Sequence, residues 1–329
     1  MSGGGDRRIP ALSPKLSPTG RRVLYAYAAT LLLFLLGALV RPGFVHGANV
    51  LTILTVAMFV GLVAAGQSFV ILIGGIDLSV PWVLNAAAIL LTTSSGGENA
   101  RAAAALALTL GMGALVGVAN GIGVAVLGVP AVVMTLAMNG IMEGLTLGLS
   151  GGMTCAACAA YAPPLVQGLA HGSLLGVPAP LWLWLAVIVV VSFLLQATVF
   201  GRATYAIGTN LRASELAGLR VRATIIGLYG LSGLTAALAG IMLVGFGGQA
   251  SLGMGEPYLF QSIAAVVIGG ASILGGRGHY LGAVAGAICL VTLISVLMAM
   301  NMAEYGRSII YGVIILVLLL LYGREAREG

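Results

Sequence analysis

The sequence predicts an all-α polytopic membrane protein with about ten transmembrane helices. Of its 329 residues, 60% are hydrophobic and 7% are charged, whereas soluble domains carry about 25% charged residues. The mean hydropathy is +1.10. Apolar runs of about 20 residues, the length that crosses a bilayer core of ~30 Å, recur between Val23 and Tyr322. The 50 glycines also suit this class, because small residues let transmembrane helices approach closely.

Apolar runs bounded by glycine, proline and charged residues place the helices in order. They are expected at residues 22–41, 49–73, 78–95, 101–127, 130–149, 179–200, 223–247, 258–275, 280–300 and 305–322. The first run follows a basic tail, but it is longer than the apolar core of about 7–15 residues in a secretory signal, so we expect a retained helix. Glycine-rich parts near 73–77 and 247–257 favour broken or re-entrant segments. Residues 1–21 and 323–329 are then tails, and 22–322 form a single transmembrane domain.

The basic residues predict that both termini lie in the cytoplasm, since Lys and Arg concentrate in cytoplasmic loops. With ten spans, only Arg41, Arg101 and Arg307 of the fifteen fall on the outer side. The segment 150–178 is then extracytoplasmic, and the segment 201–222 is a cytoplasmic loop. The net charge of +6 follows from this topology and from contact with anionic lipid headgroups, so no nucleic-acid partner is expected.

The sequence lacks the motifs of ATP hydrolysis and of intramembrane enzymes. A P-loop needs a lysine that reaches the phosphates, and the only lysine is Lys15 in the N-terminal tail. No H-E-x-x-H or G-x-S-x-G motif occurs. Cys155 and Cys158 have no second pair that would complete a zinc site, and their spacing does not decide between free thiols and a disulfide. We therefore expect no enzyme activity and no cofactor, with ATP bound by another subunit if it is used at all.

Five polar side chains fall within apolar spans, and facing lipid would be unfavourable for them. They are Gln67, Asn85, Asn120, Asn139 and Glu143. Hydrogen bonds between helices, worth about 0.6 kcal/mol on average, are one role for such side chains. Lining a translocation path, for one or two of them, is the alternative role. Glu143 is the strongest single candidate for a path or gate.

Asp77 lies in the stretch VILIGGIDLSVP at residues 70–81. An isolated aspartate at the centre of a transmembrane helix is unfavourable by ~2.5–3.5 kcal/mol. The glycines before it predict a break between two helices, with Asp77 or Ser79 capping the second helix and Pro81 in its first turn. The alternative is an ion-coupling site at Asp77.

The middle of the cytoplasmic loop predicts a short independent helix. Asn210 can cap its start and Gly218 can close it. Between them lie an apolar face and an opposite charged face, formed by Arg212, Ala213, Ser214, Glu215, Leu216 and Ala217. Because a helix of ~8 residues is marginal alone in water, it needs support from lipid headgroups or from the groove of a cytoplasmic partner.

Three ordered segments resemble ribose-type sugar permeases, the membrane subunits of bacterial ABC importers in the branched-chain/ribose permease superfamily. They are VILIGGIDLS at 70–79, YAIGTNLRASELAGLRV at 205–221 and IAAVVIGGASILGGRG at 263–278. The first and third contain the motif residues Gly74, Gly75, Asp77, Ser79, Gly269, Gly270, Gly275 and Gly276. Pro81 and Thr209 depart from the usual pattern of the family.

The resemblance implies a type II ABC-importer-like permease fold in a bacterial inner membrane. It also implies three protein partners: a second permease subunit, a cytoplasmic ABC ATPase and a periplasmic or extracellular solute-binding protein. Residues 210–218 would form the helix that couples to the ATPase, and the solute would be a monosaccharide or a similar polyhydroxylated compound. A self-sufficient facilitator or an ion-coupled carrier is the alternative function, and a membrane scaffold without transport is a third.

Overall fold

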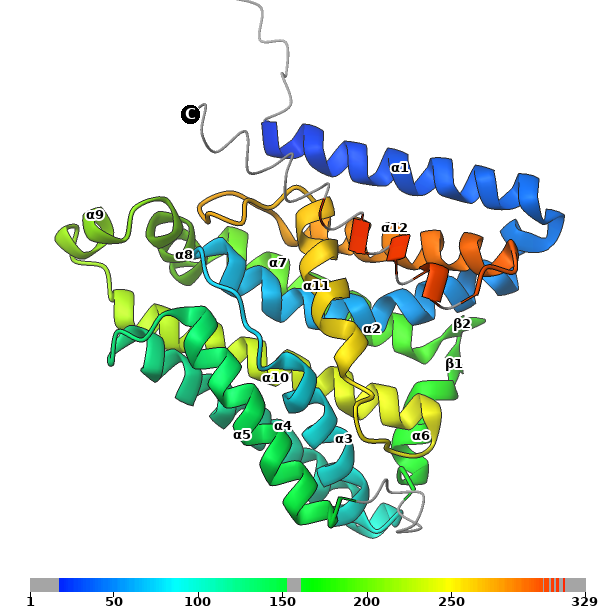
Figure 1. Ribbon diagram of the computed structural model, residues 1–329, viewed down its shortest axis with the longest axis horizontal. Coiled ribbons are helices and arrows are strands. Elements are labelled where there is room, and N and C mark those ends of the chain that lie inside the picture. The colour runs from blue at the N-terminus through cyan, green and yellow to red at the C-terminus, as the bar shows by residue number, and fades with distance from the viewer. Residues whose placement is uncertain are drawn as a thin grey trace, which may run out of the picture.

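The computed structural model describes residues 18–152 and 161–303, together with scattered residues between 305 and 316. Thirteen helical elements lie in this part of the chain, twelve of them α-helices (Figure 1). The first half contains α1 (Pro18–Val40), the 3-10 helix η1 (Pro42–Val45), α2 (Gly47–Leu72), α3 (Val80–Ser95), α4 (Asn99–Ala125) and α5 (Ala131–Ser150). The second half contains α6 (Pro164–His171), α7 (Ala179–Ala197), α8 (Val199–Thr209), α9 (Leu211–Leu216), α10 (Val221–Gly247), α11 (Glu256–Ile268) and α12 (Tyr280–Ala299). A small antiparallel hairpin pairs β1 (Ser173–Leu174) with β2 (Val177–Pro178).

Seven of the described helices are long and apolar enough to cross a membrane, namely α1, α2, α4, α5, α7, α10 and α12. The apolar helices α3 and α11 are shorter. These nine helices match nine of the ten that the sequence predicts, and the tenth, at 305–322, falls largely outside the described residues. The all-α polytopic class is confirmed.

Two predicted helix ends are wrong, and one segment expected without helices contains regular structure. The helix expected at 179–200 ends at Ala197, because Thr198 is extended and caps the separate helix α8 by accepting the Gly201 N–H at 3.2 Å. The helix expected at 258–275 ends at Ile268. Beyond it, Gly270 and Gly275 have positive φ angles of +86° and +88°, which no α-helix allows. The expected loop 150–178 contains α6 and the hairpin.

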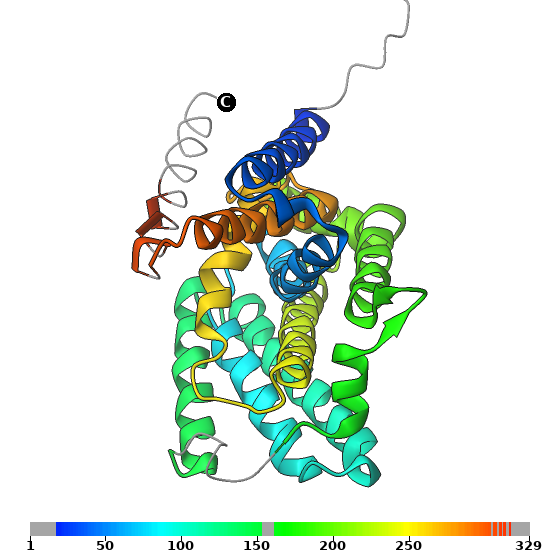
Figure 2. The ribbon, with the colours of Figure 1, turned by 90° about the vertical axis from the view of Figure 1, so that its right-hand side faces the viewer.

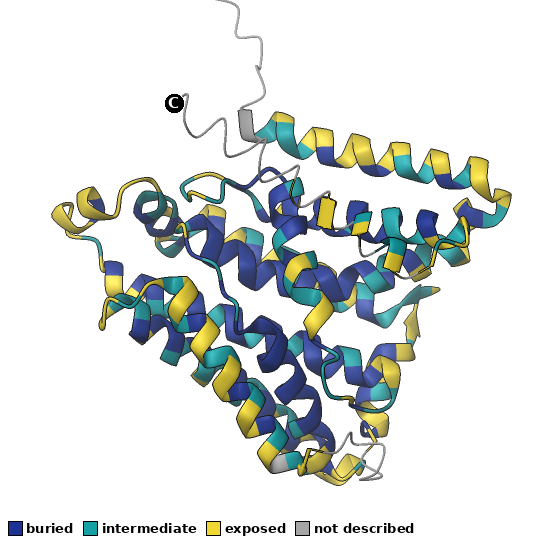
Figure 3. Cartoon of the chain, in the orientation of Figure 1, coloured by how far each residue is buried: buried dark blue, intermediate teal, exposed yellow. Residues whose placement is uncertain are grey.

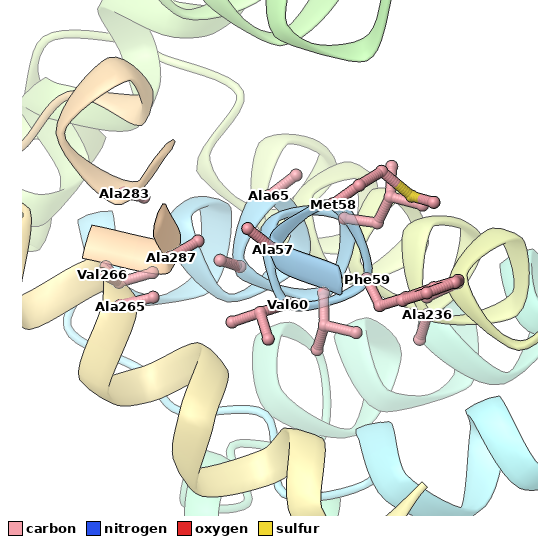
Figure 4. Close-up of a cluster of buried hydrophobic side chains, with 14 of the residues drawn as sticks. Ala57, Met58, Phe59, Val60, Ala65, Ala236, Ala265, Val266, Ala283 and Ala287 are labelled. Atoms are coloured by element: carbon pink, nitrogen blue, oxygen red, sulfur yellow. The ribbon is translucent and has the colours of Figure 1, made fainter. Parts of the chain in front are cut away.

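Helix α2 is the centre of the bundle. Figure 2 shows it between α12 and α10. From Ala57 to Leu72 its side chains are buried on all sides, which is typical of a helix that faces neither water nor lipid. In Figure 4, Ala57 and Val60 of α2 lie among Ala236 of α10, Val266 of α11 and Ala287 of α12.

The outer helices leave apolar surface uncovered. Only 17–28% of the residues in the apolar windows of α1, α4, α5 and α7 are buried, against 61–67% in α2, α10 and α12. Exposed positions run along the length of α1 and α5 (Figure 3). Such faces suit contact with lipid or with another membrane subunit.

The two ends of the bundle are built from different segments. We call the first the α9 end, formed by residues 199–220 and 269–279. The opposite hairpin end combines residues 96–99, 161–178 and 248–255, where the Ala162 N–H bonds to the Gly248 carbonyl at 2.9 Å and the Leu165 N–H bonds to Asn99 Oδ1 at 2.7 Å. Residues 161–178, which the sequence places outside the membrane, therefore meet residues 248–255 at this end.

Candidate functional site

The chain between α2 and α3 is an irregular segment, residues 73–79, with the carboxylate of Asp77 at its centre. Asp77 is 1% exposed. Its Oδ1 accepts the N–H of Ser79 at 3.0 Å and the hydroxyl of Ser79 at 2.6 Å, and its Oδ2 accepts the hydroxyl of Ser232 in α10 at 2.7 Å. These charge-assisted hydrogen bonds tie the helix break to α10.

Of the two caps that the sequence offers for α3, the one at Ser79 is wrong, because the Ser79 side chain accepts no N–H from the helix. Asp77 accepts the N–H of Ser79, the residue that directly precedes α3. Its other carboxylate oxygen is bonded to α10. Pro81 does lie in the first turn of α3, as the sequence predicts.

Three further side chains hold the break. Gln67 donates to the carbonyl of Asp77 at 2.7 Å and accepts its N–H at 3.3 Å. Thr135 of α5 accepts the Leu78 N–H at 3.0 Å, and Asn120 of α4 donates to the Ser79 hydroxyl at 2.9 Å. Gln67 and Thr135 therefore supply partners that irregular backbone needs at membrane depth. The amides of Gln67 and Asn120, which the sequence offers as path candidates, are engaged in this task.

Free hydrogen-bonding capacity remains on three amide side chains, and one of them is Asn120, whose Oδ1 is buried without a partner in the described structure. Both amide atoms of Asn85 and the Oδ1 of Asn139 are buried without a hydrogen bond in the described structure. Asn85 and Asn139 both lie near the hydrogen bond between Leu78 and Thr135. Asn85 is seven residues beyond Leu78, and Asn139 is four residues beyond Thr135. Each is therefore within about 10 Å of that bond. Helices α3 and α5 pack against each other. Glu143, one further turn along α5, is partly exposed.

At the α9 end, the three glycine-rich segments of the sequence meet in one place. Gly276 donates its N–H to the carbonyl of Leu72, the last residue of α2, at 2.9 Å. A Cβ on Gly208 of α8 would collide with that same carbonyl, and one on Gly275 would lie 2.8 Å from the N atom of Gly74. We call this contact of Leu72, Gly74, Gly208, Gly275 and Gly276 the glycine junction.

The other motif glycines also mark close contacts. A Cβ on Gly75 would lie 2.8 Å from the hydroxyl of Tyr229 in α10. Gly269 packs against the backbone of Gly282 at the start of α12, and Gly270 lies against the side chain of Arg22. The glycine positions in the motifs are therefore set by backbone packing.

Helix α9 extends away from the bundle (Figure 1, left). The predicted short helix is present, since Asn210 Oδ1 accepts the Ala213 N–H at 2.9 Å and Gly218 ends the turn with φ of +78°. Ser214 is its only buried residue. Leu211 and Leu216 are 47% and 78% exposed, so this end of the molecule offers an apolar surface without a partner. Arg212 and Glu215 form an ion pair of 3.2 Å beside it.

Three residues of this site are not among those that the sequence predicts: Thr135, Tyr229 and Ser232. Tyr229 and Ser232 are three residues apart in α10 and therefore share one helix face, which is a usable signal. A single threonine such as Thr135 gives none, because Ser and Thr are common in transmembrane helices. No group of three or more metal-binding side chains occurs within the described residues, and Cys155 and Cys158 lie outside them.

Comparison with known proteins gives one consistent result. Residues 49–318 match the family model described as branched-chain amino acid transport system / permease component.

Individual relatives agree with this match. The chain is 31% identical over 295 residues to the ribose import permease protein RbsC of Haemophilus influenzae, with 90% of this chain and 91% of that protein covered. It is 34% identical over 303 residues to the autoinducer 2 import system permease protein LsrC of Escherichia coli O157:H7, with 92% and 87% covered. It is 33% identical over 292 residues to RbsC of Bacillus subtilis, with 88% and 89% covered. No solved structure matches the chain. The chain belongs to the family of permease components of branched-chain amino acid transport systems.

Proposed function

We propose that this protein is the membrane-spanning permease subunit of an ABC importer for a monosaccharide or a similar small polyhydroxylated solute. The relatives named for ribose and autoinducer 2 import support the solute class. A separate cytoplasmic ATPase binds the nucleotide, so the chain needs no cofactor of its own. The protein lies in the cell membrane of a bacterium with both termini in the cytoplasm.

The observation that carries this proposal is the continuous connection from α9 to the interior of the bundle. Helix α9 has exposed Leu211 and Leu216, the anchors that a helix offers to a groove on a partner. It follows α8, whose end is fixed by the glycine junction to the last turn of α2. The helix break begins at that turn and is bonded through Asp77 to α10. A displacement of α9 by the ATPase is thereby passed to α2, α3 and α10 as one unit.

The path for the solute lies along α3 and α5 in this proposal. The unpaired amide of Asn85 and the unpaired Oδ1 of Asn139 suit the hydroxyl groups of a sugar, and Glu143 lies one turn beyond Asn139 on α5. A second permease subunit packs against α5. Gly140, Gly144 and Gly148 recur there every fourth residue, with nothing in the described chain within 4 Å of their Cβ positions. The path would lie between the two subunits and open alternately to either side.

At the hairpin end, a soluble solute-binding protein docks. Leu175 at the turn of the hairpin is 86% exposed. Its φ of +56° is typical of a tight turn, and this turn keeps the large apolar side chain exposed to water. This surface is at the opposite end from α9, as delivery of solute from outside requires.

Uptake assays test the proposal. Glu215→Arg breaks the exposed ion pair of α9 and should abolish ATP-dependent solute uptake with normal membrane insertion. Glu98→Arg breaks a matched pair, Glu98 with Arg101 at 3.6 Å, at the hairpin end, and stimulation of the ATPase by the permease, which Glu215→Arg should abolish, should be unchanged in it. Solute transport by the purified subunit in liposomes without an ATPase would contradict the proposal and favour a self-sufficient carrier.

A further inference from the structure

A cavity of about 600 Å³ opens between the hairpin-end termini of α2 and α12, beside the turn that joins α1 to α2. It is separate from the helix break and from α9. Arg41, Asn49, Thr52 and Ser295 contribute its polar lining, and residues such as Val56 and Ile294 contribute its apolar lining.

The polar and apolar parts are arranged along the membrane depth. Arg41 directly follows α1, and Val56 lies nine residues into α2, or about 14 Å along the helix. Val291 of α12, which also lines the cavity, is eight residues from the end of that helix, or about 12 Å. The cavity therefore runs from the membrane boundary into hydrocarbon depth, with its cation at the boundary.

Arg41 is the only ionised side chain of this lining, and it has no acidic partner among the described residues. The other polar side chains of the lining donate hydrogen bonds to backbone carbonyls within the protein. The Asn49 amide donates to the Phe44 carbonyl at 2.7 Å, Thr52 to the Ala48 carbonyl at 3.0 Å and Ser295 to the Val291 carbonyl at 2.8 Å. The guanidinium of Arg41 is therefore available to bind one anion. A guanidinium can donate two parallel hydrogen bonds to two oxygens of one phosphate group.

The side of the cavity beside Arg41 is closely packed, so the cavity exists before any ligand binds. Phe44 of the turn is buried, and its ring packs on Phe34 of α1 with centroids 6.0 Å apart. A Cβ on Gly37 would collide with the same ring, which shows how closely α1 approaches it.

We propose that this cavity binds one anionic phospholipid, with its phosphodiester on Arg41 and an acyl chain along the groove between α2 and α12. Basic pockets between transmembrane helices bind such headgroups. An ethanolamine headgroup would bring an ammonium group to a lining whose described residues include no carboxylate. The site therefore prefers a headgroup with net negative charge.

Native mass spectrometry of the full chain, released from nanodiscs of equal phosphatidylglycerol and phosphatidylethanolamine, tests this proposal. The wild-type protein should retain phosphatidylglycerol in preference to phosphatidylethanolamine. Arg41→Gln should lower that retention at least fivefold. Arg101→Gln, at the same end of the bundle, should retain as much as the wild type.

Two further measurements distinguish a bound phospholipid from a free anion on Arg41. Ser295→Phe fills the apolar groove without changing a charge and should also lower retention, while a monodisperse elution profile shows that each variant is folded. Inorganic phosphate should not displace the lipid. Wild-type retention in Arg41→Gln or Ser295→Phe, equal retention of the two lipids, or displacement by inorganic phosphate would each overturn the proposal.

Discussion

The helix break at Asp77 and the helix α9 are both short polar interruptions of an apolar chain, yet they are stabilised in opposite ways. In the break, side chains from α2, α4, α5 and α10 bond to the buried segment. In α9, one side-chain cap and one exposed ion pair hold six residues, and Leu216 faces outward. The first region is complete within the chain, whereas the second has the features of a surface that is completed by a partner. Substitutions in the break should therefore change stability, and substitutions in α9 should change function alone.

The largest effect is expected from Asp77→Ala. It removes the acceptor of three hydrogen bonds and leaves the hydroxyl of Ser232 buried without its partner. Hydrogen bonds to a charged group contribute about 1.5–3 kcal/mol each, so we expect a loss of at least about 3 kcal/mol in the free energy of unfolding. Thermal unfolding in detergent measures it.

Asp77→Asn tests the same point with a smaller change, because an amide oxygen still accepts one or two of these bonds. An intermediate melting temperature with retained uptake supports a structural Asp77. Wild-type stability combined with complete loss of uptake would instead indicate that the charge itself is needed for ion coupling.

A second effect, of about 1–3 kcal/mol, is expected from Gly208→Ala in the glycine junction. The added methyl group meets the carbonyl of Leu72 and the N atom of Gly276, both backbone atoms that cannot rotate away. Gly140→Ala is the matched control, since nothing lies within 4 Å of that position in the described chain. Equal melting temperatures for the two variants would contradict the close packing of the junction.

Leu216→Asp in α9 should change the free energy of unfolding by no more than about 0.5 kcal/mol, because the side chain is 78% exposed. Stimulation of the ATPase by the permease should nevertheless fall by an order of magnitude or more, since an apolar anchor is replaced by a charge. A large loss of stability would show that α9 packs within its own chain, and the contrast with the break would disappear.

The smallest effect concerns His279, which precedes α12 at the α9 end. Its Nδ1 accepts the Leu281 N–H at 3.2 Å, so the bond requires the neutral imidazole. Burial lowers the pKa of His279 in the folded protein, below its usual value of about 6.5. The stabilisation is therefore complete above pH ~6.5 and is lost as the pH falls through the folded pKa.

His279→Asn keeps an acceptor for that N–H and removes the titration. The melting temperature of this variant should depend less on pH between about 5 and 7 than that of the wild type, with a difference in stability of no more than about 1 kcal/mol. Identical pH profiles would show that the imidazole does not cap α12.

Most of the fold could be predicted because it depends on composition and periodicity. Apolar length gives the spans, and the glycines near 73–77 and 247–257 predict the interruptions before α3 and α11. The short helix at 211–216 could be predicted because Asn210 and Gly218 are local signals that act within one turn. The end of α11 at Ile268 could not, since Ala271, Ile273 and Leu274 continue the apolar run and the helix stops at the positive φ of Gly270.

The partners of Asp77 could not be predicted for a different reason. Ser232 is 155 residues away in the chain, and nothing local relates the two. The sequence therefore predicts a local cap by Asp77 or Ser79, and it gives no sign of the second hydroxyl, from Ser232, that packing brings to Asp77 beside that of Ser79. In the same way, polarity alone groups Gln67, Asn85, Asn120 and Asn139 together, and only the hydrogen-bond partners separate the two that hold the break.

Site-directed cross-linking tests most directly the central claim that α9 contacts a cytoplasmic ATPase. In a background without the native cysteines, Leu216→Cys and Leu175→Cys place single thiols at the two ends of the bundle, on side chains that are 78% and 86% exposed in the native protein. A bifunctional thiol reagent should join the ATPase to Leu216→Cys and not to Leu175→Cys. Cross-linking of the ATPase at Leu175→Cys, or at neither position in a complex that still takes up solute, would contradict the claim.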